Sequence, residues 1–239
     1  MSELSRKATA ELLGTAFLVV AVVGSGVAAT RLSPDDVGLQ LLENSLVTGA
    51  ALVALILALQ PVSASFNPVV TLVERALGLL ETRTAVALVA AQFAGGFLGV
   101  VVANLMFGLD ALSLSSTVRG GAGLALGEAV ATLGLVVVIF GCLRSGRKET
   151  VAYAVGGYIT AAYWFTSSTS FANPAVTVAR MFSDTFTGIA PGSVPMFVAM
   201  QLAGGAAALV LVRLLFPRVV ARPPSSRAGA GSVRRPSTR

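Results

Sequence analysis

The sequence predicts an all-α membrane protein in which six transmembrane helices and two re-entrant half-helices form an inverted repeat. Three observations support this prediction. Apolar residues make up 55% of the 239 residues and charged residues only 12%, about half the charged fraction of a soluble domain. The apolar residues gather in long segments separated by short polar ones. The motif Asn-Pro-x-Val-Thr occurs once in each half of the chain, at Asn67 and at Asn173.

The six spanning segments are runs of about 20 apolar residues, the length that crosses the hydrocarbon core of a bilayer. They follow a short N-terminal segment, residues 1–7, and we place them at 8–29, 39–59, 85–107, 122–143, 151–166 and 194–216. Pro34 follows the first span and Pro61 follows the second, and each predicts the end of a helix. Residues 217–239 are rich in Arg, Pro, Ser and Gly, which predicts a disordered basic tail.

Each Asn-Pro motif predicts the start of a short helix, because Asn is a good N-cap and Pro suits the first helical position. The half-helices would cover residues 67–80 and 173–186. Each is too short to span, since a dozen residues reach only about halfway across the bilayer. Two copies in matching apolar surroundings therefore indicate two half-helices whose N-terminal ends meet at membrane depth.

The two halves of the chain share further residues in the same order. The matched sets are Glu11 and Thr15 with Glu128 and Thr132, Asn67 with Asn173, and the Gln-x-x-Gly-Gly segments that begin at Gln92 and Gln201. The first repeat covers 8–107 and the second 122–216, each with three spans and one half-helix. An odd number of spans requires the second repeat to be inverted in the membrane.

The positions of the basic residues predict the orientation of the protein in the membrane and the class of partner that it meets. If the N-terminus is cytoplasmic, only Arg31, Arg119 and Arg180 of the 17 basic residues lie on the opposite side. We therefore expect a multi-pass protein of the cell (inner or plasma) membrane with both termini cytoplasmic. The net charge of +6 then indicates the bilayer surface and not nucleic acid as partner.

The chain contains no His and one Cys, which disfavours zinc sites, haem and a His-based triad, so we predict no enzyme activity and no cofactor. The chemistry is expected where the half-helices meet, at Asn67, Pro68 and Val69 and at Asn173, Pro174 and Ala175. Unpaired N–H groups and helix dipoles make this centre electropositive. Such a centre repels cations, while the asparagine amides donate to a passing oxygen.

These residues make the sequence similar to the major intrinsic protein family, the aquaporins and aquaglyceroporins, over about residues 8–216. The resemblance rests on both Asn-Pro motifs, on Glu11 and Glu128, and on the Gln-x-x-Gly-Gly segments. It implies a pore in each subunit and a homotetramer in the bilayer. It also implies that Glu11 and Glu128 hold the re-entrant loops by accepting hydrogen bonds from backbone N–H groups.

The sequence departs from this family at two places. Val69 replaces the usual Ala of the first motif, and Val176 stands where the family usually has Arg after the second. By spacing from the asparagines, the positions of the family's outer constriction fall on Val47, Ala161, Ser170 and Val176. All four are small or apolar, so we expect a wider, less polar mouth. The channels of bacterial arsenic-resistance loci are similar, with Val in place of the Arg.

Arg180 has two possible roles. It lies one helical turn beyond Val176, on the same face, where it would supply charge to the vestibule. Asp184 lies a further turn along the chain, and an Arg180–Asp184 ion pair is the interpretation that we favour. In that case proton exclusion depends on the half-helix fields alone.

The sequence thus predicts a passive transmembrane channel for small neutral solutes with a wide apolar selectivity filter. Arsenous acid, which is neutral at pH 7 and about the size of glycerol, or a polyol is the expected solute. A water or glycerol channel is the alternative. An ion-coupled secondary transporter also uses inverted repeats and broken helices, but it needs an ion-coordinating group at the centre, where this motif offers only Asn.

Overall fold

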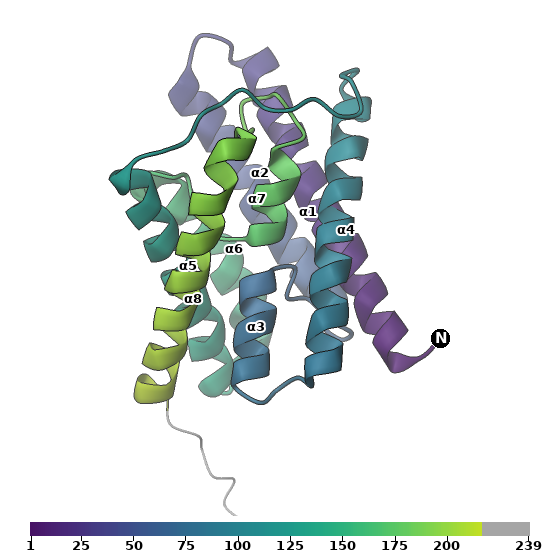
Figure 1. Ribbon diagram of the computed structural model, residues 1–239, viewed down its shortest axis with the longest axis vertical. Helices are drawn as coiled ribbons and strands as arrows, with labels where there is room; N and C mark the ends of the chain where they lie inside the picture. The colour runs from purple at the N-terminus through teal and green to yellow at the C-terminus, as the bar shows by residue number, and fades with distance from the viewer. Residues whose placement is uncertain (217–239) are drawn as a thin grey trace, which may run out of the picture.

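All regular elements in the computed structural model, which describes residues 1–216, are helices (Figure 1). The long ones are α1 (Glu3–Leu32), α2 (Val37–Leu59), α4 (Thr82–Met106), α5 (Ala122–Arg144), α6 (Val151–Phe165) and α8 (Val194–Leu215). The short ones are α3 (Pro68–Ala76), α7 (Pro174–Arg180) and the 3₁₀ turns η1 (Lys148–Thr150) and η2 (Pro191–Ser193). The predicted tail, 217–239, lies outside the described residues.

Within residues 1–216, five helices are long and apolar enough to cross a membrane: α1, α2, α4, α5 and α8. The sixth long helix, α6, has 15 residues, which corresponds to about 22 Å and is shorter than the roughly 30 Å hydrocarbon core. The turn η1 precedes it directly and lengthens this segment by three residues.

The two halves of the molecule use the same packing scheme. In the first half α1 packs along α4 and α2, and in the second half α5 packs along α8 and α6. Glycines allow the closest of these crossings. A Cβ on Gly95 of α4 would lie 2.3 Å from the carbonyl oxygen of Leu12, and a Cβ on Gly204 of α8 would lie 2.3 Å from that of Ala129. These glycines are therefore required for the backbones to approach.

The half-helices tie the two halves together. In Figure 1, α3 lies in the lower half of the molecule and α7 in the upper half. Each packs against long helices of both halves, namely α4 and α8. Gly205 of α8 faces the Val69 side chain at the start of α3, and Gly96 of α4 faces the Ala175 carbonyl at the start of α7.

Both half-helices are shorter than the sequence predicts. We expected 67–80, but α3 ends at Ala76 because Gly78 takes a left-handed backbone (φ 77°) and the chain turns away. We expected 173–186, but α7 ends at Arg180. The carbonyls of Met181 and Phe182 instead accept hydrogen bonds from the N–H groups of Ser115 and Ser113. Those serines belong to the connection 107–121, which crosses the upper end of the molecule (Figure 1).

Candidate functional site

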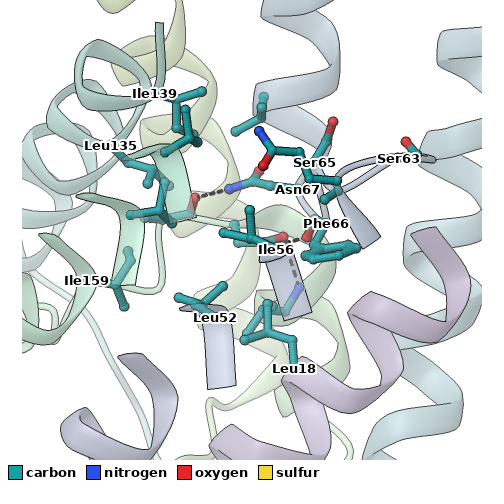
Figure 2. A pocket seen from close by; sticks show the side chains of 18 of the residues that line it. Leu18, Leu52, Ile56, Ser63, Ser65, Phe66, Asn67, Leu135, Ile139 and Ile159 are labelled. Atoms are coloured by element: carbon teal, nitrogen blue, oxygen red, sulfur yellow. Dashed lines mark hydrogen bonds between the residues drawn. The ribbon is translucent and has the colours of Figure 1, made fainter. Parts of the chain in front are cut away.

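A cavity of about 300 Å³ runs between the two half-helices. Much of its wall is apolar: Figure 2 shows Leu52 and Ile56 of α2, Leu135 and Ile139 of α5 and Ile159 of α6 around it. The motif segments supply the polar groups, because Asn67 and Asn173 both line the cavity. The neighbouring Pro68, Val69, Pro174 and Ala175 are buried behind these asparagines.

Asn67 and Asn173 bind the two half-helices to each other. The side-chain oxygen of each accepts hydrogen bonds at the start of its own helix, from Val69 N–H in α3 and from Ala175 and Val176 N–H in α7. Its amide nitrogen donates to the opposite half. Asn67 Nδ2 lies 2.7 Å from the Ala172 carbonyl oxygen, and Asn173 Nδ2 lies 2.7 Å from the Phe66 carbonyl oxygen. The helix starts are thus adjacent.

The two acceptors in these crossed hydrogen bonds have an uncommon backbone. Phe66 (φ 47°) and Ala172 (φ 48°) are both in the left-handed region, which costs a non-glycine residue roughly 1–2 kcal/mol. Each immediately precedes a motif asparagine. This conformation lets the chain reverse and enter the half-helix while its carbonyl points to the opposite asparagine.

Glu11 of α1 organises the loop before α3. One carboxylate oxygen accepts from the N–H of Ser65 at 2.9 Å and from the Ser63 hydroxyl. The other accepts from the N–H of Phe66 at 2.7 Å and from the amide of Gln92 at 2.8 Å. The carboxylate is fully buried, so these donors replace the water that it lost on burial.

Glu128 of α5 does the same in the second half. Its oxygens accept from the N–H groups of Phe171 at 2.9 Å and Ala172 at 3.0 Å, and from the amide of Gln201. Gln201 also donates to the Thr177 hydroxyl, as Gln92 does to the Thr71 hydroxyl. Both loops are therefore held by a buried carboxylate together with a Gln and a Thr from the same repeat.

Two of the four residues predicted for the constriction line the cavity and two do not. Ser170 and Val176 are buried and line it. Val47 is 44% exposed, and Ala161 is exposed as well. In their place Thr48 of α2 and Tyr163 of α6 line the cavity, with their hydroxyls 3.2 Å apart. Val47 and Ala161, which we predicted for the wider and less polar mouth, are therefore not among the residues that line the cavity.

Helical register explains this correction. The cavity-lining residues of α2 are Thr48, Leu52 and Ile56, and those of α6 are Val151, Val155, Ile159 and Tyr163, each four residues from the next. Val47 is one position and Ala161 two positions away from these stripes, so their side chains point elsewhere. Ungapped counting from the asparagines missed this, whereas a search for the apolar i, i+4 stripe would have indicated Thr48 and Tyr163.

The predicted Arg180–Asp184 pair does not form. Asp184 is exposed and accepts hydrogen bonds from the N–H and hydroxyl of Ser116, and the N–H contact holds the pKa of this carboxyl below its usual value. Arg180 is 3% exposed, lines the cavity and donates from Nε to the Thr187 carbonyl. Its Cζ lies 3.4 Å from the centroid of the Phe171 ring. The guanidinium therefore lines the cavity and does not pair with Asp184, which is the pairing that the sequence favoured.

Two half-helices joined at their N-terminal ends beside a cavity, inside a bundle of apolar helices, define the architecture of a membrane channel. The family model of the Major intrinsic protein matches residues 1–157. The chain is 51% identical over 214 residues to the aquaglyceroporin AqpS of Rhizobium meliloti (strain 1021), covering 89% of this chain and 91% of that protein.

The fold has a counterpart among solved structures. The X-ray structure of the aquaglyceroporin from Plasmodium falciparum matches with a TM-score of 0.68 at 17% identity, over 90% of this chain and 96% of that one. The chain belongs to the major intrinsic protein family. It is a channel of the aquaporin and aquaglyceroporin class and not an enzyme.

Proposed function

We propose that the chain is a passive channel that conducts small neutral solutes of polyol size through the cavity between α3 and α7. The observation that carries this proposal is the crossed pair of hydrogen bonds from Asn67 and Asn173, which brings two helix starts together at one point of the cavity wall. Each asparagine amide has a second N–H. That N–H is the donor we assign to the solute oxygen.

The solute proposal rests on four residues that line the cavity, namely Thr48, Tyr163, Ser170 and Val176. Val176 presents only methyl groups at the position where an arginine would narrow the path. The hydroxyls of Thr48 and Tyr163 supply polar contacts beside it. This combination suits a compact solute with several hydroxyls, such as glycerol or arsenous acid. The name aquaglyceroporin, carried by both proteins reported above, favours glycerol-sized solutes over water alone.

The proposed topology follows the basic residues, with both termini in the cytoplasm of a cell whose inner or plasma membrane holds the protein. The end of the cavity near Glu74 then faces the cytoplasm, and the end near Arg180 faces outward. We also propose a homotetramer in which each subunit keeps its own pore. The exposed apolar side chains of the long helices, among them Phe17, Phe97 and Leu202, would then contact lipid or neighbouring subunits.

Stopped-flow light scattering on proteoliposomes tests the proposal. The purified protein should accelerate the entry of glycerol and arsenous acid well above empty vesicles. Val176→Arg should reduce both fluxes far more than water flux, because a guanidinium would then narrow the path. Fast water flux without glycerol or arsenous acid flux would rule out the wide path and leave a water channel. Absence of any flux, in vesicles shown to contain folded protein, would refute the channel itself.

A further inference from the structure

Two oppositely charged side chains occupy equivalent positions in the two repeats. Glu74 lies seven residues after Asn67, and Arg180 lies seven residues after Asn173. Both line the cavity. The intervening residues that line it, Val70 and Val176, are equivalent as well. On each helix the lining residues follow the i, i+3, i+7 spacing that keeps side chains on one face.

These two charges lie at opposite ends of the cavity. Seven helical residues correspond to about 10 Å along each axis. Because α3 and α7 start at the same place and lie in opposite halves of the molecule (Figure 1), Glu74 and Arg180 are displaced in opposite directions from the motif asparagines. Uncharged side chains such as Leu52, Ile56 and Leu135 line the same cavity (Figure 2).

Arg180 forms no ion pair within residues 1–216, and the carboxylate that acts on it there, that of Glu128, is engaged by backbone N–H groups and by Gln201. The ion pair that residues 1–216 contain joins Lys7 to Glu3, both on α1. Among the described residues Arg180 donates to a backbone carbonyl, that of Thr187, and stacks on Phe171. Arg119 adds a second guanidinium whose Cζ lies 5.2 Å from the centroid of the same ring. Two guanidinium groups against the one carboxylate of Glu128 leave this end of the cavity positive.

Among the described residues, four that line the cavity are charged: Glu74, Lys7, Lys148 and Arg180. Glu74 is the carboxylate in this set. Glu74 is half-buried, and its Oε2 accepts from the Ser65 hydroxyl at 2.9 Å. Lys7 is paired with Glu3 at 2.7 Å, and Lys148 is exposed on η1. Charges in water are weakened by its dielectric and by salt, whereas a partly buried charge acts more strongly. When ionised, Glu74 is therefore the partly buried negative charge at this end of the cavity.

Without a negative charge on this path, an anion would be attracted along its whole length. The guanidinium of Arg180 attracts it, and so do the helix starts at Asn67 and Asn173. We propose that Glu74 is the anion barrier of the channel and that Arg180, its equivalent in the second repeat, is the cation barrier at the other end. This inference rests on the proposed channel function. Every ion is then repelled at one end, while a neutral hydroxylated solute accepts from Arg180 and donates to Glu74.

Ion permeability of the reconstituted full-length chain, measured at about pH 8 where the Glu74 carboxyl is ionised, tests this pairing. Vesicles holding a potassium chloride gradient, read with a voltage-sensitive dye, report the sign of any leak, and glycerol flux in the same vesicles provides the reference. Glu74→Gln keeps an acceptor for Ser65 and should raise chloride permeability relative to glycerol by at least about tenfold, since a charge barrier of several RT is lost. Arg180→Gln keeps a donor for Thr187 and should raise potassium permeability by a similar factor.

Two further variants change the charge of the path and leave Glu74 and Arg180 in place, so the test does not depend on whether variants at those two residues fold. Val176→Glu would place a carboxylate one turn from Arg180 and neutralise its field, so it should give the same potassium leak as Arg180→Gln. Val70→Lys should likewise give the chloride leak of Glu74→Gln. Matched controls are Glu149→Gln and Arg31→Gln, which are exposed and do not line the cavity.

The outcomes separate the two proposals. Leaks of opposite sign in the Glu74 and Arg180 variants, with tight wild-type and control vesicles, support the paired barriers. Variants as ion-tight as the wild type, or leaks of the same sign, overturn them even if glycerol flux is normal. Wild-type vesicles with no glycerol flux would instead refute the channel function on which the pairing rests.

Discussion

At the residue scale, helical register decides which side chains meet the solute. Thr48 and Val47 are neighbours in the chain, yet Thr48 is 3% exposed and lines the cavity, whereas Val47 is 44% exposed on the outside. One residue along a helix rotates the side chain by about 100°. A substitution at one of these positions therefore affects the path, and the same substitution at the other affects only the outer surface.

Thr48→Trp should reduce glycerol flux by about tenfold or more, because an indole would fill part of a cavity whose wall is already close-packed. Val47→Trp is the matched control and should retain wild-type flux, since its side chain lies outside. The measurement is stopped-flow scattering at equal protein content. Equal losses in the two variants would show that the assigned register is wrong.

Glu11 is the residue whose loss should most disturb the first motif. Glu11→Ala leaves the N–H groups of Ser65 and Phe66 without their acceptor, at about 1–3 kcal/mol for each unsatisfied buried group. We expect a clear drop in the apparent Tm in detergent, together with reduced glycerol flux. Glu81→Ala, at an exposed position with no side-chain cap bond, should leave Tm unchanged. A Tm equal to wild type in Glu11→Ala would contradict the supporting role.

At the element scale, close helix crossings set the position of the half-helices. Gly95 and Gly204 bring α4 against α1 and α8 against α5, and the adjacent Gly96 and Gly205 receive the starts of α7 and α3. The Gln that precedes each Gly pair reaches the carboxylate of the same repeat. One turn of α4 therefore sets its distance from α1 and positions the motif loop of the first repeat. One turn of α8 does the same for α5 and the second repeat.

Gly95→Ala should lower the free energy of unfolding by about 1–3 kcal/mol, the usual result of overpacking, because its Cβ would meet the Leu12 carbonyl. Gly157→Ala in α6 is the control: nothing lies within 4 Å of its Cβ position. Alanine there should be neutral or stabilising by up to about 1 kcal/mol. Thermal unfolding of both variants in the same detergent gives the comparison, and equal stabilities would argue against the tight crossing.

The connection 107–121 should respond to pH through Asp184. Hydrogen bonds from Ser116 lower the pKa of Asp184 below its ordinary 3.8. A carboxyl with a lowered pKa in the folded state stabilises the fold above its unfolded pKa, and this stabilisation is lost as the pH falls through the folded value. The Tm difference between wild type and Asp184→Asn should thus be constant from pH 7 to about 5 and shrink as the pH falls below 3.8 and through the folded value. A difference that grew on acidification would reverse the assigned sign.

At the scale of the whole molecule, the two repeats enclose one continuous cavity. Residues of both halves line it, and the half-helices meet within it. Glu11 and Glu128 are engaged by backbone N–H groups and are absent from the cavity lining. The carboxylate that does line the cavity, Glu74, lies about two helical turns from the motif asparagine and not at the centre. This arrangement favours a passive path over an ion-coupled one.

Glycerol flux should therefore be unaffected when sodium and proton gradients are imposed or collapsed with ionophores. Its rate should rise linearly with the glycerol gradient, because no conformational cycle limits it. Initial rates in proteoliposomes provide the measurement, with empty vesicles as the blank. Uptake that saturates and follows an imposed ion gradient would support the secondary transporter instead.

The sequence by itself determined the helical class, the two repeats and the central motifs, because these depend on local properties: apolar length, the Asn-Pro helix start and the recurrence of Glu, Gln and Gly-Gly. Only the tertiary structure decided which neighbours meet. It placed Thr48 and Tyr163 in the path instead of Val47 and Ala161, separated Arg180 from Asp184, and set Arg180 on Phe171. Facing directions and contacts across the cavity depend on helix rotation and on loop paths, and residue spacing along one chain does not specify either.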